Sequence, residues 1–470
     1  MSIIAIILIP LIGACLLPLA GYVSRRLRNV LALVFILASC VISATLVPLV
    51  AAGKTVVVSR NFALGFNFIF VADSLAVFMA LTSSLISAII VFYSFGYMSH
   101  YENQNEYYFM VVLFLGAMMG LVFSGNLVLL YIFWEITAIT SWRLIGFFNE
   151  KAHLLRADKA FLVTVFGALV MLLGFLNIYQ QTGTFDLKPA LISNAAVALI
   201  LVGIFSKSAT LPFHTWLPDA GVAPSPVTAL LHAAILVKIG LYVFARLFIA
   251  TYSVEQFWHT FVPAVAAVSS IVAAGAALVE TDLKRIIAYS TVSQIGFIFF
   301  GLAIGNAIGI AGGLLYILMH GLSKAGLFLC AGIIEQNTKT KDITKLGGLI
   351  TTMPITAVSF LACAFSVMGI PPFGGFFSKY MVFAGAVAGR QFLIGGVFLA
   401  GACMTILYLL RVFNLVFLGE ARIAGVREAS PVMVASVAIM AILSLAGGIL
   451  VYYPSWFAHI TVTQMAGLVK

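Results

Sequence analysis

Seven ionisable side chains interrupt apolar segments of the sequence, and they are the residues best suited to carry chemistry. They are Glu135, Lys207, His232, Lys238, His320, Lys324 and Lys379. An ionisable group at bilayer depth is costly, so it usually faces a bundle interior or a water-filled cavity and marks an ion or proton path. Lysine and histidine side chains can both take up and release a proton. The set therefore predicts a buried proton pathway.

Glu135 lies in the run Ile-Phe-Trp-Glu-Ile-Thr-Ala, where a carboxylate among apolar neighbours needs a cation from another helix. Lys207 is the expected partner. A nearby carboxylate stabilises the charged form of a buried lysine, so moving the carboxylate away would favour release of the proton. The pair is therefore expected to act as a switch.

The histidines differ in how they are spaced from the nearest lysine. His232 and Lys238 are six residues apart, which separates them by about 120° on an ideal helix. His320 and Lys324 are four residues apart and are expected to share one helix face, where they would form a two-step proton relay.

Proline interrupts two of the apolar segments near these lysines. Pro212 and Pro218 follow Lys207, and Pro371 and Pro372 precede Lys379. Broken helices in a membrane are tolerated where they line a cavity, and a matching pair of them is typical of inverted-repeat transporters. His214, beside the first break, is expected to act either as a proton relay or as a capping residue.

Other charged residues lie near expected helix ends. Arg143, Arg246 and Arg411 can extend towards the headgroups, so structural roles are favoured for them. Asp73 is expected to cap or anchor the third span, or else to shape an outlet.

Composition identifies the elements that must position these groups. The 470 residues are 63% hydrophobic and 9% charged, with a mean hydropathy of +1.15. Soluble domains contain about 25% charged residues, so a soluble globular protein is excluded. About fourteen apolar segments have spanning length. They cover 2–22, 29–50, 65–97, 108–125, 127–147, 160–181, 192–212, 222–250, 260–279, 286–304, 308–334, 352–376, 392–418 and 431–453.

The loops between these segments indicate an orientation. If the loops alternate sides, most basic residues outside the spans fall on one side, among them Arg25, Lys151, Arg285 and Lys341. The positive-inside rule places that side in the cytoplasm. An even number of spans then predicts a multi-pass protein of the cytoplasmic membrane, with both termini on the non-cytoplasmic side.

Several classes of ligand are not expected. The net charge of +10 is dispersed in short groups, which argues against nucleic-acid binding. The five cysteines form no CxxC pair or Cys/His cluster, so neither a metal site nor an iron–sulfur centre is expected. No P-loop or dinucleotide-binding glycine motif occurs, so no cofactor is expected in this chain.

Two adjacent runs resemble the signature of a known family. They are Phe-Ser-Lys-Ser-Ala-Thr-Leu-Pro-Phe-His-Thr-Trp-Leu-Pro-Asp-Ala (205–220) and Ala-Pro-Ser-Pro-Val-Thr-Ala-Leu-Leu-His-Ala-Ala (223–234). They resemble the antiporter-like subunits of respiratory complex I (NADH:quinone oxidoreductase), Mrp cation/proton antiporters and energy-converting membrane-bound hydrogenases. The resemblance extends from the Trp134-Glu135 helix through Asp282-Leu-Lys-Arg-Ile-Ile-Ala-Tyr-Ser-Thr-Val-Ser-Gln-Ile-Gly296 to Lys379.

The resemblance implies an all-α polytopic fold of fourteen helices with inverted five-helix repeats and broken helices 7 and 12. The implied parts are an N-terminal region (1–107), two repeats (108–250 and 251–420) and a last helix (421–470). By position, Glu135 and Lys207 resemble the family's ion pair, and His232 its bridging position. Lys324 resembles the central lysine, and Lys379 the lysine near the exit.

Arg143 departs from the family pattern, and it either biases Glu135 or reaches the cytoplasmic surface. Lys238, within Ile-Leu-Val-Lys-Ile-Gly, resembles the Mrp and hydrogenase branches.

These observations predict a non-catalytic subunit of a multisubunit redox-driven pump that moves protons or sodium ions. Its expected partners are other membrane subunits, including redox subunits. Three alternatives remain: a subunit of a non-redox Mrp-type cation/proton antiporter, a stand-alone carrier, and a partner-binding subunit with a vestigial channel.

Overall fold

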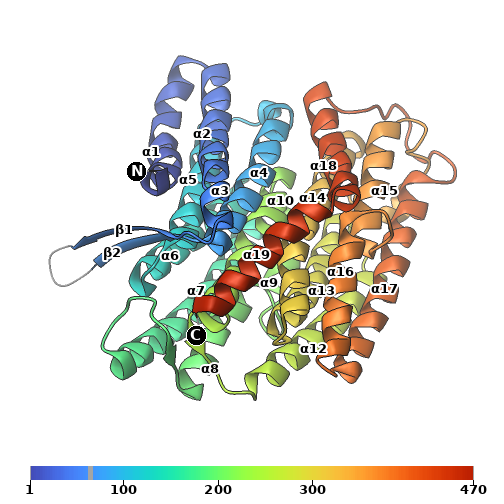
Figure 1. The fold of residues 1–470 in the computed structure, drawn as a ribbon. Coiled ribbons are helices and arrows are strands. Elements are labelled where there is room, and N and C mark those ends of the chain that lie inside the picture. Colours follow the sequence, from blue (N-terminus) through green and yellow to red (C-terminus); the bar gives the residue numbers. More distant parts are fainter. Residues whose placement is uncertain (1, 62–66, 469–470) are drawn as a thin grey trace.

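The computed structural model describes residues 2–61 and 67–468 as a bundle of long helices (Figure 1). Residues 1, 62–66 and 469–470, which fall within the predicted parts 1–107 and 421–470 and the predicted span 65–97, lie outside the described residues. The first half contains α1 (Ser2–Val23), α2 (Arg25–Thr45), α3 (Val47–Ala51), α4 (Ser74–Tyr97), η2 (Met98–His100), α5 (Gln104–Phe123), α6 (Leu127–Ile145), α7 (Lys151–Thr182), α8 (Asn194–Lys207), α9 (Trp216–Asp219), η3 (Ala220–Val222), α10 (Ser225–Ala229), η4 (Leu230–Ala234) and α11 (Leu236–Phe248).

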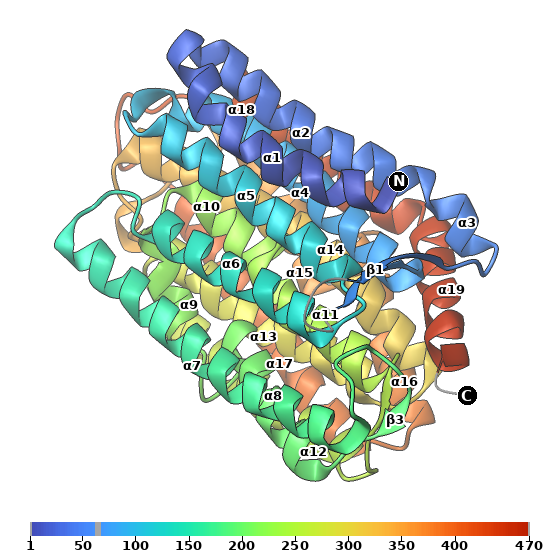
Figure 2. The same ribbon diagram turned by 90° about the vertical axis from the view of Figure 1, so that its left-hand side faces the viewer.

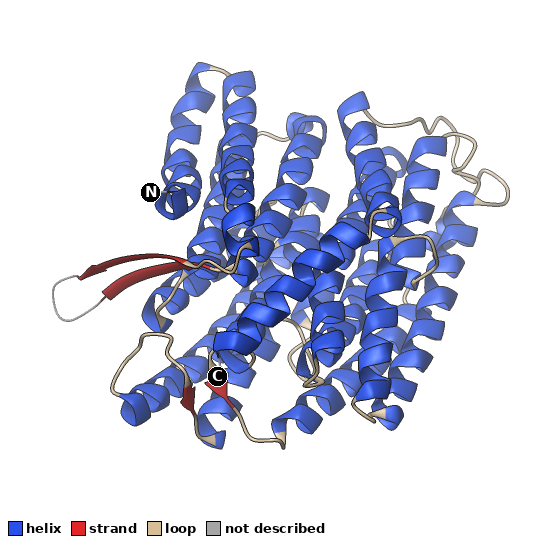
Figure 3. Ribbon diagram, viewed as in Figure 1, coloured by secondary structure: helices blue, strands red, loops and turns tan. Residues whose placement is uncertain are grey.

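The second half is entirely helical apart from one short strand. It contains α12 (Trp258–Val279), α13 (Leu283–Ala303), α14 (Ala307–Thr338), η5 (Ile343–Lys345), α15 (Pro354–Met368), α16 (Gly374–Ala388), α17 (Phe392–Phe417), α18 (Pro431–Ile449) and α19 (Tyr452–Leu468). The strands β1 (Val56–Asn61) and β2 (Asn67–Ala72) pair antiparallel, with Val56 opposite Ala72. The strands β3 (Ala190–Leu191) and β4 (Tyr252–Ser253) pair in parallel. Both strand pairs lie at the edges of the bundle (Figure 3).

Side-chain caps begin four of the long helices. Asp73, Asn126, Asp282 and Asn306 accept hydrogen bonds from backbone N–H groups in the first turns of α4, α6, α13 and α14. Such caps satisfy donors that have no partner inside the helix. Continuous apolar runs then carry each helix across the bundle.

Within the described residues, twelve helical stretches are long and apolar enough to cross a membrane, and α8 and α15 are shorter apolar helices. The chain is therefore a polytopic helical membrane protein. The stretch from α10 to α11 and the helices α13 and α14 are almost completely enclosed, whereas α2 and α17 expose most of their surface. The core lies where these enclosed helices meet.

The bundle has two distinguishable ends. We call the end that carries Arg25, Lys151 and Arg285 the basic end, and the end that carries Asp73 the opposite end. The beginning of α1 and the last turns of α19 lie together at the opposite end (Figure 2). Consistent with this position, the Gln464 side chain accepts from Ser74 N and donates to the Val50 carbonyl.

Both predicted helix breaks are present. The chain leaves α8 at Lys207 and passes Pro212 before α9 begins, and it leaves α15 at Gly369, whose φ is +83°. Pro371 and Pro372 occupy the turn before α16. Lys207 thus precedes its break and Lys379 follows its own.

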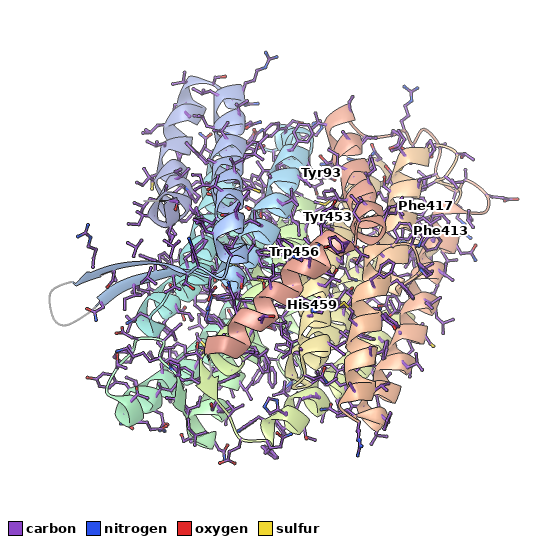
Figure 4. All side chains as sticks on the ribbon, viewed as in Figure 1. Tyr93, Phe413, Phe417, Tyr453, Trp456 and His459 are labelled. Atoms are coloured by element: carbon purple, nitrogen blue, oxygen red, sulfur yellow. The ribbon has the colours of Figure 1, made fainter. Side chains whose placement is uncertain are left out.

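Three local expectations were wrong. The span expected over 65–97 begins only at Ser74, because the preceding residues form β2. The segment 352–376 ends as a helix at Met368, and α16 is a separate helix. The helix α19, which had no expected counterpart, crosses α14 and α4 obliquely, with Tyr453, Trp456 and His459 following one another along it (Figure 4).

Candidate functional site

The Lys207 side chain is fully buried at the end of α8. Its Nζ donates to the Trp134 carbonyl at 3.2 Å and lies 5.1 Å from the centre of the Trp134 ring. Small residues allow α8 to approach α7 this closely, because a Cβ on Gly203 would lie only 2.6 Å from the Cβ of Met171. The lysine is therefore held by a carbonyl and a ring face.

Glu135, also on α6, is half-buried, and its Oε1 is enclosed without a hydrogen-bond partner. No ion pair joins Glu135 to Lys207 in the described part of the chain, although their charges interact electrostatically. The predicted pair is thus found in a separated arrangement.

His232 lies in η4, a single π-helical segment that ends at Ala234. This segment was not predicted, and it means that the ideal-helix angle of about 120° does not relate His232 to Lys238. The His232 ring is 4.5 Å from the Phe328 ring, and neither ring nitrogen has a hydrogen-bond partner. Buried polar atoms without partners indicate a place for ordered water.

Lys238 and His320 meet at the centre of the bundle. Lys238 Nζ lies 2.8 Å from His320 Nδ1 and donates to the Ile317 carbonyl at 3.2 Å. Both side chains are fully buried. This contact joins α11 of the first half to α14 of the second half, and it leaves His320 Nε2 without a partner.

Lys324 shares α14 with His320 but engages a different neighbour. Its Nζ contacts Ser290 Oγ on α13, and Ser290 Oγ lies 2.6 Å from Tyr408 Oη on α17. No hydrogen bond joins His320 to Lys324, so the expected direct relay between them is absent in this arrangement. The two residues instead connect α14 to opposite sides of the core.

Lys379 lies in α16 and donates from Nζ to the Val367 carbonyl at 2.7 Å. Its Nζ is 4.7 Å from the Phe297 ring centre and 5.6 Å from that of Tyr316. Tyr316 donates to Gln294 Oε1 at 2.6 Å, and Gln294 donates to Thr405 Oγ1 at 3.1 Å. Uncharged polar groups therefore line the way between Lys324 and Lys379.

Sequence reasoning missed these uncharged groups. Ser290 and Gln294 are four residues apart on α13, and Thr405 and Tyr408 are three apart on α17. A search for helical spacing of uncharged polar residues within apolar segments would have found them.

Two arginines have more specific partners than expected. Arg143 forms an ion pair with Glu106 and donates to Asn149 Oδ1 at 2.9 Å, so it turns towards the basic end. Arg246 forms a buried ion pair with Asp73, which also caps α4. Arg411 donates to the carbonyls of Leu278 and Glu280 at the end of α12, which agrees with a structural role.

A network of ion pairs at the basic end fixes the segment that follows the first helix break. Asp219 Oδ2 accepts from Lys159 at 2.8 Å and its Oδ1 from Arg285 at 2.7 Å. Arg285 also donates to Glu280 Oε2 at 2.8 Å. Burial alone would raise the pKa of Asp219, but the two hydrogen bonds hold that pKa below its usual range. This network clamps α9 between α7 and α13.

His214 lies in the irregular segment between α8 and α9, and its Nδ1 has no partner. Its side chain caps no helix in the structure, so the relay role stays a prediction. Among the described residues, no group of three or more His, Cys, Asp or Glu side chains is arranged to hold a metal ion. All five cysteines are free.

Two family models match the sequence. The model described as NADH:quinone oxidoreductase/Mrp antiporter, TM, matches residues 124–405. The model described as NADH-Ubiquinone oxidoreductase (complex I), chain 5 N-terminus, matches residues 60–108. The first match covers more than half of the chain and includes all seven predicted pathway residues.

Curated relatives include the A1 subunit of a Na(+)/H(+) antiporter from Staphylococcus haemolyticus, which is 35% identical over 86% of this chain and 55% of the relative. The corresponding Na(+)/H(+) antiporter protein of Alkalihalophilus pseudofirmus is 40% identical over 68% of this chain and 43% of the relative. The chain thus spans about half the length of these curated relatives.

Two solved structures share the fold. A chain of the Mrp complex from Dietzia sp. DQ12-45-1b superposes with a TM-score of 0.91 at 23% identity, covering 100% of this chain and 99% of that chain. A chain of the archaeal membrane-bound sulfane sulfur reductase superposes with a TM-score of 0.87 at 23% identity, covering 99% of this chain and 98% of that chain. The chain belongs to the NADH:quinone oxidoreductase/Mrp antiporter transmembrane family.

Proposed function

We propose that this chain is an ion-translocating subunit of an Mrp-type Na⁺/H⁺ antiporter. The support is the similarity to subunits of Na⁺/H⁺ antiporters together with the buried Lys238–His320 contact, which links the polar groups of the two halves. The redox-driven pump that the sequence favoured has no matching support among these relatives, and its non-redox alternative fits them better. Redox subunits are therefore removed from the proposed partners, whereas other membrane subunits remain.

The proposed topology has fourteen crossings. Twelve are the long apolar stretches, and the broken pairs α8–α9 and α15–α16 supply the other two. The inverted repeats would be 108–250 and 251–420, supported by the opposite placement of Lys207 and Lys379 relative to their breaks. The basic end would face the cytoplasm of a bacterial plasma membrane, with both termini on the other side.

The proposed mechanism follows the polar groups in order. Closure of the Glu135–Lys207 pair would stabilise the protonated lysine, and separation would favour transfer of its proton through water at His232. The proton would continue through the Lys238–His320 contact to Lys324, and then along Ser290, Gln294 and Tyr316 to Lys379. The chain's residues hold and move protons, and the sodium route belongs to the assembly.

The test is sodium-driven proton movement in everted membrane vesicles that contain the assembled antiporter, monitored with a pH-sensitive dye. We expect Lys207→Ala to reduce antiport by about tenfold or more, because a buried charge on the path is lost. The matched control is Lys345→Ala, whose side chain is 70% exposed at the basic end, and it should retain full antiport. Wild-type antiport by Lys207→Ala in a correctly assembled complex would refute the proposal.

A second measurement addresses the choice between antiporter and redox pump. The complex would be purified in mild detergent through a tag on this chain, and its flavin and iron contents measured. A complex free of both that exchanges sodium for protons in liposomes supports the antiporter. Co-purifying iron–sulfur or flavin subunits would overturn it in favour of a redox pump.

A further inference from the structure

The helix α11 carries polar side chains at three positions, each four residues after the last. They are Lys238, Tyr242 and Arg246. Residues at this spacing lie on one helix face, so the three form a column that runs from the centre of the bundle to its opposite end. Lys238 begins the column at its contact with His320, and all three side chains are buried.

The end of the column is an enclosed ion pair. Arg246 donates from Nη2 to Asp73 Oδ1 at 2.8 Å and from Nη1 to Asp73 Oδ2, and the two side chains are only 6% and 4% exposed. Arg246 Nε also donates to Tyr242 Oη at 2.8 Å, and Tyr242 donates to the Val122 carbonyl at 2.6 Å. One guanidinium group therefore holds both the acid of α4 and the hydroxyl above it.

A cavity lies directly outside this ion pair. Its volume is about 210 Å³, and its lining includes Asp73, Arg246, Ser124, Asp186 and Lys188. A polar cavity of this size holds several water molecules. Its wall is completed by β2 and by the residues that follow α11, so it lies at the opposite end of the bundle.

An ion pair that only anchors α4 has a simpler alternative. Replacing a buried ion pair by apolar side chains is often neutral or stabilising, so burial of this pair is weak evidence for a purely structural role. Its position between a hydrated cavity and a polar column is better explained by a barrier to water.

We propose that the cavity is the mouth of a proton outlet along α11, running from the Lys238–His320 contact, and that the Asp73–Arg246 ion pair closes it. When the pair separates, water from the cavity reaches Tyr242 and then Lys238, and the proton leaves to the non-cytoplasmic side. While the pair is closed, the guanidinium repels cations at the mouth. This outlet rests on the proposed function and adds a second exit to the one expected at Lys379.

The test is access of a membrane-impermeant thiol reagent in right-side-out vesicles containing the full assembly, with the five native cysteines replaced. Val71→Cys reports on the cavity, because Val71 lines it outside the ion pair. Tyr242→Cys reports on the column behind the pair. We expect Val71→Cys to react in every background. Tyr242→Cys should react roughly tenfold or more faster when Asp73→Asn is added, because removing one partner of a buried ion pair strongly destabilises its closed arrangement.

Equal reactivity of Tyr242→Cys with and without Asp73→Asn would overturn the proposal and make the pair an anchor. An unreactive Val71→Cys would also overturn it. If Asp73→Asn impairs assembly, Arg246→Gln replaces it, since it leaves the Asp73 cap on α4 in place. Lys324→Ala separates this result from the proposed function: antiport lost in Lys324→Ala with no change in access rejects the outlet alone, whereas antiport retained in Lys324→Ala rejects the shared pathway.

Discussion

The polar groups of the two halves are satisfied to very different degrees. In the first half, Glu135 Oε1 and both nitrogens of His232 are buried without hydrogen-bond partners. In the second half, Lys324 contacts Ser290, which contacts Tyr408, and a further chain joins Tyr316 to Gln294. Buried groups without partners are costly and readily change partner, whereas a satisfied network is rigid. The first half is therefore suited to switching and the second to conduction.

The largest effect is expected at the start of the second network. We expect Lys324→Ala to lower antiport by about tenfold or more, because the network loses the ionisable group that feeds it. Antiport in everted vesicles measures this directly, with the amount of assembled complex as a control. A variant with normal antiport would remove the distinction between the two halves.

Removal of single hydroxyl groups from the second network should have intermediate effects. Tyr408→Phe leaves Ser290 without one partner, and loss of one neutral hydrogen bond changes free energies by about 1 kcal/mol, or several-fold in rate. We expect antiport to fall several-fold and the protein's thermal stability to fall slightly. An effect as large as that of Lys324→Ala would mean that Tyr408 itself carries the proton.

The clamp on α9 should affect stability more than transport. Asp219→Asn removes a carboxylate held by Lys159 and Arg285, and we expect a loss on the order of 1 kcal/mol at neutral pH. Because folding lowers the pKa of Asp219, its contribution is complete above the unfolded value of about 4 and is lost as the pH falls through the folded value. Thermal unfolding of both proteins in detergent should therefore differ at pH 7 and converge in acid. A difference that grows in acid would contradict this sign.

The smallest effect is expected at Arg143. Its ion pair with Glu106 turns it away from the switch, so Arg143→Gln should leave antiport within about twofold of wild type, as is usual for exposed ion pairs. The measurement is the pH profile of antiport in this variant. A displaced profile would show that Arg143 biases Glu135 after all.

Much of the architecture was accessible from the sequence because bilayer thickness limits the length of each apolar segment. The breaks at Pro212 and Pro371 were visible for the same reason that they exist, since proline cannot continue a helix. The hairpin before α4 was hidden because Phe68, Ile69 and Phe70 are as apolar as a span. The count of fourteen crossings and the repeats stay predictions.

The site was only partly predictable. Charged residues in apolar segments were recognisable, but their contacts depend on which helices are neighbours, and that information is not local. The sequence therefore suggested a closed Glu135–Lys207 pair and a direct His320–Lys324 relay, whereas His320 contacts Lys238 from α11. The π-helical segment at His232 was equally hidden, because no residue type marks it.

The central claim is that one proton path crosses from the first half to the second through Lys238 and His320. The most direct test is His320→Gln in the purified assembly reconstituted in liposomes. Glutamine preserves a hydrogen bond to Lys238 but does not titrate, so sodium-driven proton movement should fall by roughly tenfold or more, with the assembly intact. Adding Lys238→Met should cause little further loss, because both residues act in one step. Wild-type proton movement in His320→Gln would contradict a path through this contact.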